Sequence, residues 1–213
     1  VDDMTDMSKA FRERLKKDFC IKGLAAADVK KASDGTKKFL SVLDDGKKIE
    51  SVIIPEADRA TLCVSSQAGC GYGCAFCKTG EMRSARNLTL SELAGQVFAA
   101  KTILEKNERL TNIVLMGMGE PLANYDNVLK FLNILTDPKG FGFSRNKVTV
   151  SSCGIVPEIK KLGKDTDVNL AISLNAAADE TRSRIMPINK KYPQKELIPA
   201  LRGYPLKGKK HIT

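Results

Sequence analysis

The sequence predicts an α/β fold in which parallel strands alternate with helices, preceded by a helix and a β-hairpin. From about Thr61 onward, short runs of β-branched and aliphatic residues alternate with longer amphipathic segments. This alternation is typical of parallel strands joined by right-handed crossover helices. Earlier in the chain, Asp45-Gly46 stands between two β-rich runs, and an Asp-Gly pair in that position is a strong hairpin signal. We therefore expect a mainly parallel sheet with helices packed against it.

The first part of the chain is predicted to form a helix and then the hairpin. Ser8 is a possible N-cap, and five apolar residues at helical spacing predict a core-facing helix: Met4, Met7, Phe11, Leu15 and Phe19. The hairpin should cover residues 37–54. Pro55 is expected to end its second strand, because proline donates no ladder hydrogen bond.

The remaining elements follow from the hydrophobic pattern. Thr89 and Glu92 form a capping box, which predicts the start of a helix. Later helices are expected near residues 128–135, 157–162, 179–185 and 194–201. The predicted strands are residues 60–65, 112–116, 147–150 and 167–173, with 209–213 as the opening of a fifth.

Unusual loops follow the predicted strands. In parallel α/β folds, functional sites gather at the carboxyl ends of the strands. The loops that are rich in Gly, Ser, Cys or Pro all follow a predicted strand: 66–80, 117–121, 151–154 and 173–176. Their shared position predicts that they form one active site.

The composition is that of a globular protein with a basic surface. The 213 residues are 42% hydrophobic and 28% charged, and no apolar run approaches the length of a membrane span, so we expect no membrane association. Lys and Arg number 35 against 25 Asp and Glu, which gives a formal net charge of +10. This excess suits a polyanionic partner such as RNA, although a merely soluble basic protein has the same composition. Aromatic residues are only 6%, without Trp, so base stacking is not the obvious binding mode.

The most informative segment is a cysteine loop, residues 70–80. Cys70, Cys74 and Cys77 have the spacing C-x3-C-x2-C, and glycines lie between and after them. A short Gly-rich loop can fold its backbone around a compact object and direct three thiolates toward it. Four thiolates complete a four-iron cluster, so a set of three predicts an iron–sulfur cluster with one iron free to bind a small molecule.

Two other uses of the cysteines stay open. Six cysteines could form disulfides, but three within eight residues are poor partners for each other. Nothing resembling a signal peptide opens the chain, which favours a reducing compartment and a cytoplasmic protein. Zinc is the stronger alternative, although it usually takes two separated ligand pairs and the chain has a single histidine, His211.

The motifs together resemble the RlmN/Cfr family of radical S-adenosylmethionine (SAM) RNA methyltransferases. Phe76 stands just before the third cysteine, as in the cluster loops of radical SAM enzymes. The resemblance extends to four further segments, residues 59–70, 86–89, 116–121 and 171–191. It implies a partial (βα)6 barrel with about four of its six units. It also implies three regions: a remnant of an N-terminal helical accessory domain (1–35), a β-hairpin extension (36–58) and an incomplete barrel (59–213).

The resemblance also implies an activity. Members of this family methylate C2 of an adenosine in 23S rRNA, at the peptidyl transferase centre, and of an adenosine in the tRNA anticodon loop. They use a [4Fe–4S] cluster, SAM and an external, flavodoxin-like electron donor, and a monomer is expected. The alternatives are Cfr-type methylation at C8 and, because the chain resembles a fragment without the family's C-terminal methyl-carrying cysteine, an inactive iron–sulfur RNA-binding module.

Roles for single residues follow from the same resemblance. Cys70, Cys74 and Cys77 would hold three irons, and the amino and carboxylate groups of SAM would chelate the fourth. The expected SAM contacts are Gly119, Glu120, Ser151, Ser173, Leu174 and Asn175. Asn175 and Cys153 depart from the family, which commonly has His at the first position and Ser or Val at the second.

Two more positions match catalytic residues of the family. Cys63 would help to resolve a covalent protein–RNA intermediate. Read from the sequence alone, it is a buried strand cysteine or a fourth cluster ligand. Glu50 would act as a proton acceptor, whereas its pattern alone predicts an exposed strand residue.

Overall fold

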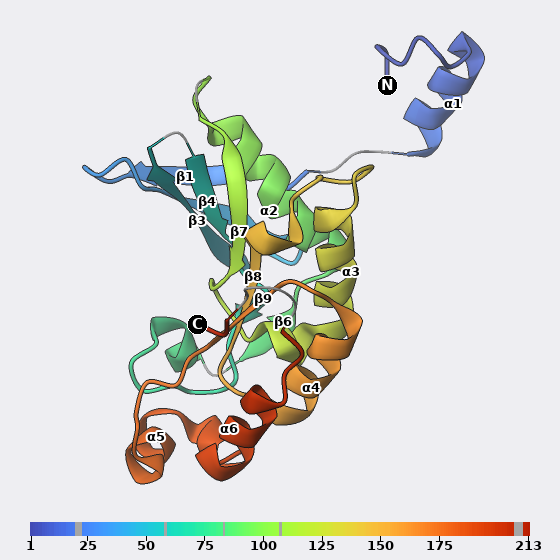
Figure 1. The fold of residues 1–213 in the computed structure, drawn as a ribbon. Coiled ribbons are helices and arrows are strands. Elements are labelled where there is room, and N and C mark those ends of the chain that lie inside the picture. Colours follow the sequence, from blue (N-terminus) through green and yellow to red (C-terminus); the bar gives the residue numbers. More distant parts are fainter. Residues whose placement is uncertain (20–22, 58, 83, 107, 207–210) are drawn as a thin grey trace.

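The computed structural model describes the chain except for residues 20–22, 58, 83, 107 and 207–210. Among the described residues, one seven-stranded sheet has the order β1-β2-β3-β4-β7-β8-β9 (Figure 1). The last four strands in this order are parallel, which confirms the predicted α/β class. They are β4 (Arg59–Cys63), β7 (Leu110–Leu115), β8 (Val148–Ser152) and β9 (Asn169–Ile172).

The hairpin is present and is part of the main sheet. It consists of β2 (Lys37–Val42) and β3 (Lys48–Glu56), and the Asp45–Gly46 turn is closed by a hydrogen bond from Gly46 N to Leu43 O (2.9 Å). The sequence did not predict β1 (Ala26–Lys31), which pairs with β2, or the antiparallel pairing of β3 with β4. The hairpin thus extends the parallel sheet on its β4 side.

The expectation that Pro55 ends the second hairpin strand is wrong. Strand β3 runs to Glu56, and Pro55 pairs with Ala60 of β4. Proline has a backbone φ that is compatible with an extended strand, so it is tolerated where its missing N–H is not needed. Its position near the end of the strand meets that condition.

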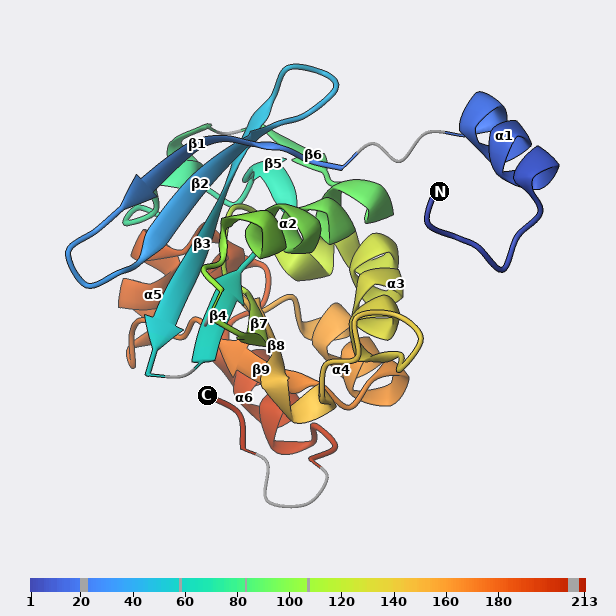
Figure 2. The ribbon, with the colours of Figure 1, turned by 90° about the horizontal axis from the view of Figure 1, so that it is seen from above.

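Helices α2 (Leu90–Ile103), α3 (Tyr125–Thr136) and α4 (Val156–Asp165) pack on one face of the sheet (Figure 2). The predicted capping box of α2 is confirmed: Thr89 N–H donates to the Glu92 carboxylate (2.8 Å) and Glu92 N–H to the Thr89 hydroxyl (3.3 Å). Two short helices follow the last strand, as predicted. They are α5 (Asp179–Ile185) and α6 (Gln194–Arg202).

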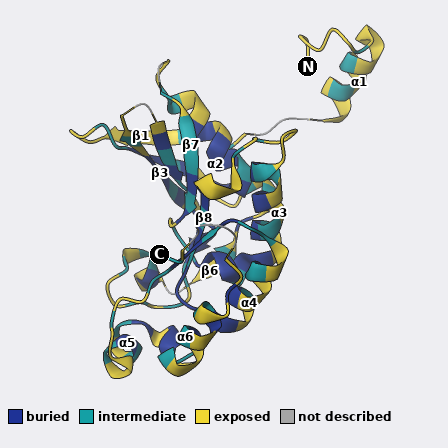
Figure 3. Cartoon of the chain, viewed as in Figure 1, coloured by how far each residue is buried: buried dark blue, intermediate teal, exposed yellow. Residues whose placement is uncertain are grey.

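The core lies between the sheet and these helices (Figure 3). Alternate strand residues are fully buried there, for example Leu62, Ile113 and Val150. Since side chains alternate across a strand, the residues between them face the other side of the sheet. Cys63 and Ser151 belong to this second set and are only half-buried. The less covered face therefore remains available for ligands.

The helix predicted near the N-terminus is α1 (Lys9–Asp18), and Ser8 caps it by accepting a hydrogen bond from Phe11 N (3.3 Å). The prediction that it faces the core is wrong. None of its residues is buried, Phe11 is 48% exposed, and the helix lies apart from the sheet in both ribbon views (Figures 1 and 2). Apolar spacing reveals that a helix has an apolar side, but it does not reveal which element covers that side.

The predicted fifth strand, 209–213, lies partly outside the described residues. Within the described part, Thr213 exchanges two backbone hydrogen bonds with β9: Thr213 N to Leu170 O (3.2 Å) and Ile172 N to Thr213 O (2.8 Å). The chain end therefore runs beside β9, where a further strand of the sheet would lie.

Shorter elements were not predicted. Strands β5 (Gln67–Gly69) and β6 (Ala85–Asn87) form a small antiparallel pair that flanks the cysteine loop. The 3-10 helices are η1 (Lys78–Met82), η2 (Pro121–Asn124), η3 (Arg145–Lys147) and η4 (Pro187–Lys190). Over the ranges that the structure describes, none of the helices has the length and apolar character needed to cross a membrane.

Candidate functional site

A cavity of about 260 Å³ lies at the carboxyl ends of the parallel strands. Its walls come from each of the four loops that the sequence analysis singled out, so the prediction that these loops meet is confirmed. The cysteine loop supplies Cys70, Tyr72, Cys74, Phe76 and Cys77, and the loop after β7 supplies Gly117, Gly119, Glu120 and Pro121. The ends of β8 and β9 supply Ser151, Ser152, Cys153 and Ser173, and Met186 follows α5.

The cysteine loop folds tightly, and its three thiols line this one cavity. Hydrogen bonds from Cys77 N to Cys74 O (3.1 Å) and from Gly80 N to Cys77 O (3.0 Å) close consecutive turns. A Cβ on Gly80 would lie only 3.0 Å from Cys74 O, so the close approach of these turns favours glycine. Ala75 N donates to Ile185 O (2.8 Å), which ties the loop to the end of α5.

The electrostatics of the thiols suit a cationic centre. Burial raises the pKa of the Cys70 thiol, and it raises that of Cys74 to about 11, with further contributions from Cys70, Cys77 and Glu120. Three thiolates crowded beside a carboxylate repel one another, and a bound polycation removes this cost while releasing the protons. The loop therefore fits a group that neutralises several thiolates together.

The arrangement favours a cluster over zinc. Among the described residues, no three His, Cys, Asp or Glu side chains are grouped so that they could hold one metal ion. Structural zinc needs four ligands around one ion, whereas a four-iron cluster takes one thiolate on each iron. The five cysteines that the structure describes are all free, so disulfides do not account for the loop.

Glu120 is the buried acid of the site. Its side chain is 4% exposed, and its carboxylate accepts hydrogen bonds from Leu122 N (3.0 Å) and Cys153 N (2.7 Å). Burial raises the pKa of Glu120, and these two donors partly oppose that effect. An ionised carboxylate has about four acceptor sites, so capacity remains for a cationic donor in the cavity.

The other expected SAM contacts divide into two groups. Gly119, Ser151 and Ser173 line the cavity, whereas Leu174 and Asn175 do not. Asn175 has a backbone φ of +58°, a left-handed conformation that asparagine adopts more readily than most residues. Its side-chain amide contacts the sulfur of Met186 (3.3 Å), a wall residue, so Asn175 supports the cavity from behind.

Cys63 lies next to the cavity and does not line it. It ends β4 on the less covered face of the sheet, and its sulfur accepts a hydrogen bond from the backbone of Met116, a wall residue. Burial raises the pKa of Cys63. Cys63 therefore lies behind Met116, which forms part of the cavity wall, and apart from the three loop cysteines.

Glu50 lines a second cavity of about 540 Å³, whose other residues include Lys48, Lys78 and Met118. Its carboxylate pairs with Lys38 (2.8 Å). The two cavities flank the same short segment, because Gly117 and Gly119 line the first and Met118 lines the second. Glu50 and Glu120 thus face different cavities, separated by this segment.

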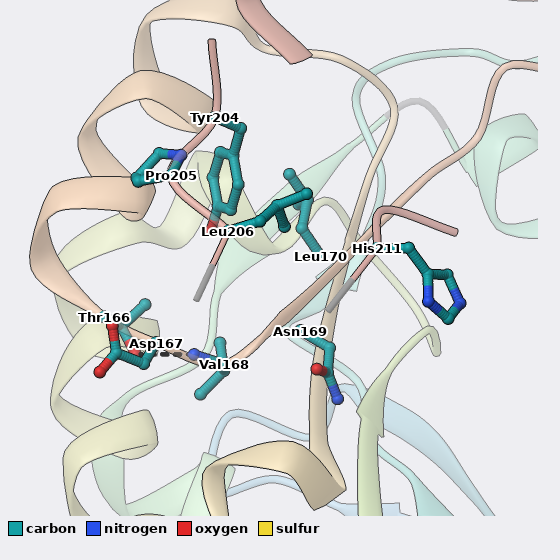
Figure 4. A pocket seen from close by; sticks show the side chains of 9 residues that line it. All are labelled: Thr166, Asp167, Val168, Asn169, Leu170, Tyr204, Pro205, Leu206 and His211. Atoms are coloured by element: carbon teal, nitrogen blue, oxygen red, sulfur yellow. Dashed lines mark hydrogen bonds between the residues drawn. The ribbon is translucent and has the colours of Figure 1, made fainter. Parts of the chain in front are cut away.

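A third cavity is unrelated to the cysteines. It measures about 10 Å³ and lies around the start of β9, with the side chain of His211 on its rim (Figure 4). This volume admits about one water molecule. The start of β9 is the opposite end of the strands from the cysteine loop, so the single histidine of the chain takes no part in the main site.

Sequence reasoning gave no role to Tyr72 or Arg182, both of which shape the site. Tyr72 lines the cavity between the first two cysteines, and burial raises the pKa of its hydroxyl, which stays protonated. Arg182 on α5 is fully buried and donates to backbone carbonyls of the β8 and β9 loops. Its charged neighbours in the sequence resemble an exposed helix face, so no local pattern distinguishes it.

Replacement of Gly119 by alanine should destabilise the fold. Gly119 has a φ of +94°, and its Cβ would lie 2.5 Å from the Cβ of Gln67 and 2.8 Å from its backbone nitrogen. We expect a loss of about 2–4 kcal/mol in the free energy of unfolding, from backbone strain and overpacking together. Urea denaturation measures it. Gly71→Ala is the control, because a Cβ there meets no atom within 4 Å. An equal loss in both variants would contradict this account.

Comparison with known proteins gives consistent similarities. The family model described as the radical SAM superfamily matches residues 64–212. The chain is 54% identical over 211 residues to the dual-specificity RNA methyltransferase RlmN of Geotalea uraniireducens, and 52% identical over 213 residues to that of Desulfosudis oleivorans. These alignments cover 99% and 100% of this chain, but 60% and 57% of the relatives. The chain therefore spans about three fifths of the length of the curated relatives that it matches.

A solved structure gives the same result. The crystal structure of a radical SAM methyltransferase from Sphaerobacter thermophilus matches with a TM-score of 0.88 and 42% sequence identity. The match covers 95% of this chain and 60% of that one. The arrangement of strands around the cavity is thus shared with a solved protein over nearly all of this chain.

Proposed function

Because this chain belongs to the radical SAM superfamily, we propose that Cys70, Cys74 and Cys77 hold a [4Fe–4S] cluster and that SAM binds beside it in the same cavity. The observation that carries the proposal is the shared cavity, which three thiols and a buried carboxylate line together. When bound, the cluster and SAM supply a 5′-deoxyadenosyl radical by one-electron cleavage of a C–S bond.

The residues of the cavity then have separate tasks. Glu120 accepts hydrogen bonds from the amino group of SAM, and Gly119 lets the ligand approach the backbone. Ser151 and Ser173 offer hydroxyl groups at the ends of β8 and β9. Leu174 and Asn175 act indirectly, by holding the loop that carries Ser173.

We infer that the reaction is methylation of RNA, on the basis of the relatives' names and the net charge of +10. The finer proposal is methylation at C2 of an adenosine in 23S rRNA and in tRNA. The second cavity, with Lys48 and Lys78 on its walls, is the place where an RNA nucleotide would meet the cofactor site. Glu50 would accept a proton there, and Cys63 would resolve a covalent RNA intermediate from behind the cavity wall.

Several further proposals depend on this function. The electron donor is a flavodoxin-like protein, and the protein acts as a cytoplasmic monomer. Residues 1–35 belong to an accessory domain, 36–58 to the hairpin extension and 59–213 to the catalytic barrel.

The test of the proposed function is cleavage of SAM. The anaerobically reconstituted chain, reduced with dithionite, should release 5′-deoxyadenosine from SAM, as measured by chromatography. After addition of RNA, chromatography of the digested nucleosides against 2-methyladenosine and 8-methyladenosine standards, which have the same mass, distinguishes methylation at C2 from methylation at C8. A protein that carries the cluster but neither binds nor cleaves SAM would contradict the proposal.

Binding of RNA should weaken steeply with salt. If about four phosphates are contacted, affinity should fall about 100-fold between about 50 and 200 mM salt. Lys78→Gln should reduce the slope of log K against log salt by about one, because Lys78 is highly exposed at the second cavity. Fluorescence anisotropy measures both effects.

The matched control for this prediction is Lys139→Gln. Lys139 is also exposed, but it lies between α3 and β8, at the amino end of the strands. The control should keep the parent slope. If the Lys139 variant lowers the slope as much as the Lys78 variant, RNA does not bind preferentially at the second cavity.

A further inference from the structure

Arg182 is the largest fully buried side chain of the described residues, and it is a cation. The hydrogen bonds that its guanidinium makes all go to neutral oxygens. They are Cys153 O (2.7 Å), Ser173 O (3.2 Å), Leu174 O (3.1 Å) and the amide oxygen of Asn189 (2.5 Å). Desolvation lowers the pKa of Arg182, but an arginine keeps its charge in proteins. A buried charge is costly, so its retention here requires an explanation.

The four acceptors come from three segments, two of which line the cavity. Cys153 follows β8, Ser173 and Leu174 follow β9, and Asn189 belongs to η4. Cys153 and Ser173 line the cavity themselves. Because a guanidinium is planar and rigid, it fixes the relative positions of the carbonyl groups that it bonds. Arg182 thus sets the spacing between the ends of β8 and β9.

The same helix also holds the cysteine loop. Ile185, three residues after Arg182, accepts the hydrogen bond from Ala75 N (2.8 Å), and Ala75 lies between Cys74 and Cys77. Met186 N donates to Arg182 O (2.7 Å), and Met186 forms another part of the cavity wall. One turn of α5 therefore connects the cysteine loop to the SAM-facing strand ends.

A second layer orients Arg182. The amide nitrogen of Asn189 donates to the Asp179 carboxylate (2.8 Å) and to the Ser183 hydroxyl (2.8 Å), which leaves its oxygen directed at Arg182. Asp179 also accepts from Gln194 N (2.9 Å) and so links α5 to the start of α6. Arg182 and Asn189 are buried, and the hydrogen bonds of Asn189 continue outward to Asp179 at the surface, so the buried part of the network is satisfied, as a rigid support requires.

We infer that Arg182 is a positioning residue for SAM: it holds the ends of β8 and β9 at a fixed place relative to the cysteine loop, so that SAM can contact both at once. The inference rests on the proposed function and deepens it. The buried charge of Arg182 then serves to place the cofactor site and not only to stabilise the fold.

The test compares Arg182→Gln, Arg182→Lys and Asn189→Ala with the parent chain after anaerobic reconstitution. Each protein is assayed for iron per chain, for SAM affinity by calorimetry and for the change in the electron paramagnetic resonance signal of the reduced cluster when SAM is added. Arg184→Gln is the matched control, because Arg184 lies on the same helix and is exposed.

We expect Arg182→Gln to keep its iron but to lose at least about tenfold in SAM affinity, together with the SAM-dependent spectral change. Arg182→Lys should lose nearly as much SAM affinity as Arg182→Gln, because an ammonium keeps the charge but not the planar set of donors. Asn189→Ala removes one acceptor and should give a smaller loss. It also serves as the readout if the Arg182 variants do not fold. The control should match the parent.

Two outcomes would overturn the inference. One is a set of folded Arg182 and Asn189 variants that bind SAM within about twofold of the parent, even if they melt earlier, because Arg182 would then serve stability alone. The other is full rescue by Arg182→Lys, which would show that charge suffices without geometry. Failure of the parent itself to bind SAM would instead contradict the proposed function, so the two failures are distinguishable.

Discussion

Replacement of Cys74 by alanine is expected to abolish iron binding. The parent should take up about four irons per chain on anaerobic reconstitution, as one four-iron cluster requires. Cys74 is the middle cysteine of the loop, and its thiol is close enough to Cys70 and Cys77 for their charges to raise its pKa. Loss of one thiolate from a set of three leaves two irons without a protein ligand. Iron analysis and visible absorbance measure the result.

The matched control is Cys63→Ala. Cys63 is also half-buried, but it lies behind the wall of the cavity, so its loss should leave the iron content unchanged. Loss of the cluster in this variant would mean that Cys63 is itself a cluster ligand. Iron-free protein with stoichiometric, tightly bound zinc would refute the cluster assignment itself.

Replacement of Glu120 by glutamine should remove most SAM affinity while the cluster remains. The carboxylate is the one acid that lines the cavity among the described residues, and the amide that replaces it carries no charge to strengthen a hydrogen bond from the amino group of SAM. A charge-assisted hydrogen bond is worth roughly 1.5–3 kcal/mol, which corresponds to a loss of about 10- to 150-fold. Calorimetry at constant iron content measures this loss.

The pH dependence gives an independent check on Glu120. Burial raises its pKa, so the parent carboxylate takes up a proton earlier than an exposed glutamate as the pH falls. The protonated acid resembles the amide. The difference in SAM affinity between parent and variant should therefore be largest at high pH and should shrink as the pH is lowered. A difference that stays constant with pH, or an unchanged affinity, would mean that Glu120 does not bind the amino group of SAM.

The parts of the site that could be predicted from the sequence are those that depend on local pattern. The alternation of strands and helices places each loop at the carboxyl end of a strand, so the meeting of the four loops follows from the class of fold. The C-x3-C-x2-C spacing keeps the three cysteines within eight residues, so that their thiols can reach one bound group. The capping box of α2 is likewise encoded within four residues.

The parts that could not be predicted depend on contacts between distant segments. Pairing of β3 with β4 joins the hairpin to the sheet, and neither strand carries a signal for its partner. Helix α1 has the spacing of a buried helix but is exposed. Arg182 resembles a surface residue until the ends of β8 and β9 are placed around it. Glu50 is assigned by resemblance, and only the structure reveals that it faces a cavity of its own.

Residues 117–119, between the two cavities, limit which substitutions the chain tolerates there. A Cβ at Gly117 would lie 2.8 Å from the backbone of Val64, and one at Gly119 would lie 2.5 Å from Gln67, so neither position tolerates a larger residue. Met118, between them, has its side chain at the second cavity alone. Of residues 117–119, only Met118 therefore tolerates substitution, and its side chain lies at the second cavity. If RNA binds at the second cavity as proposed, a change at position 118 would alter the substrate side alone, because the two glycines prevent change on the side of the first cavity.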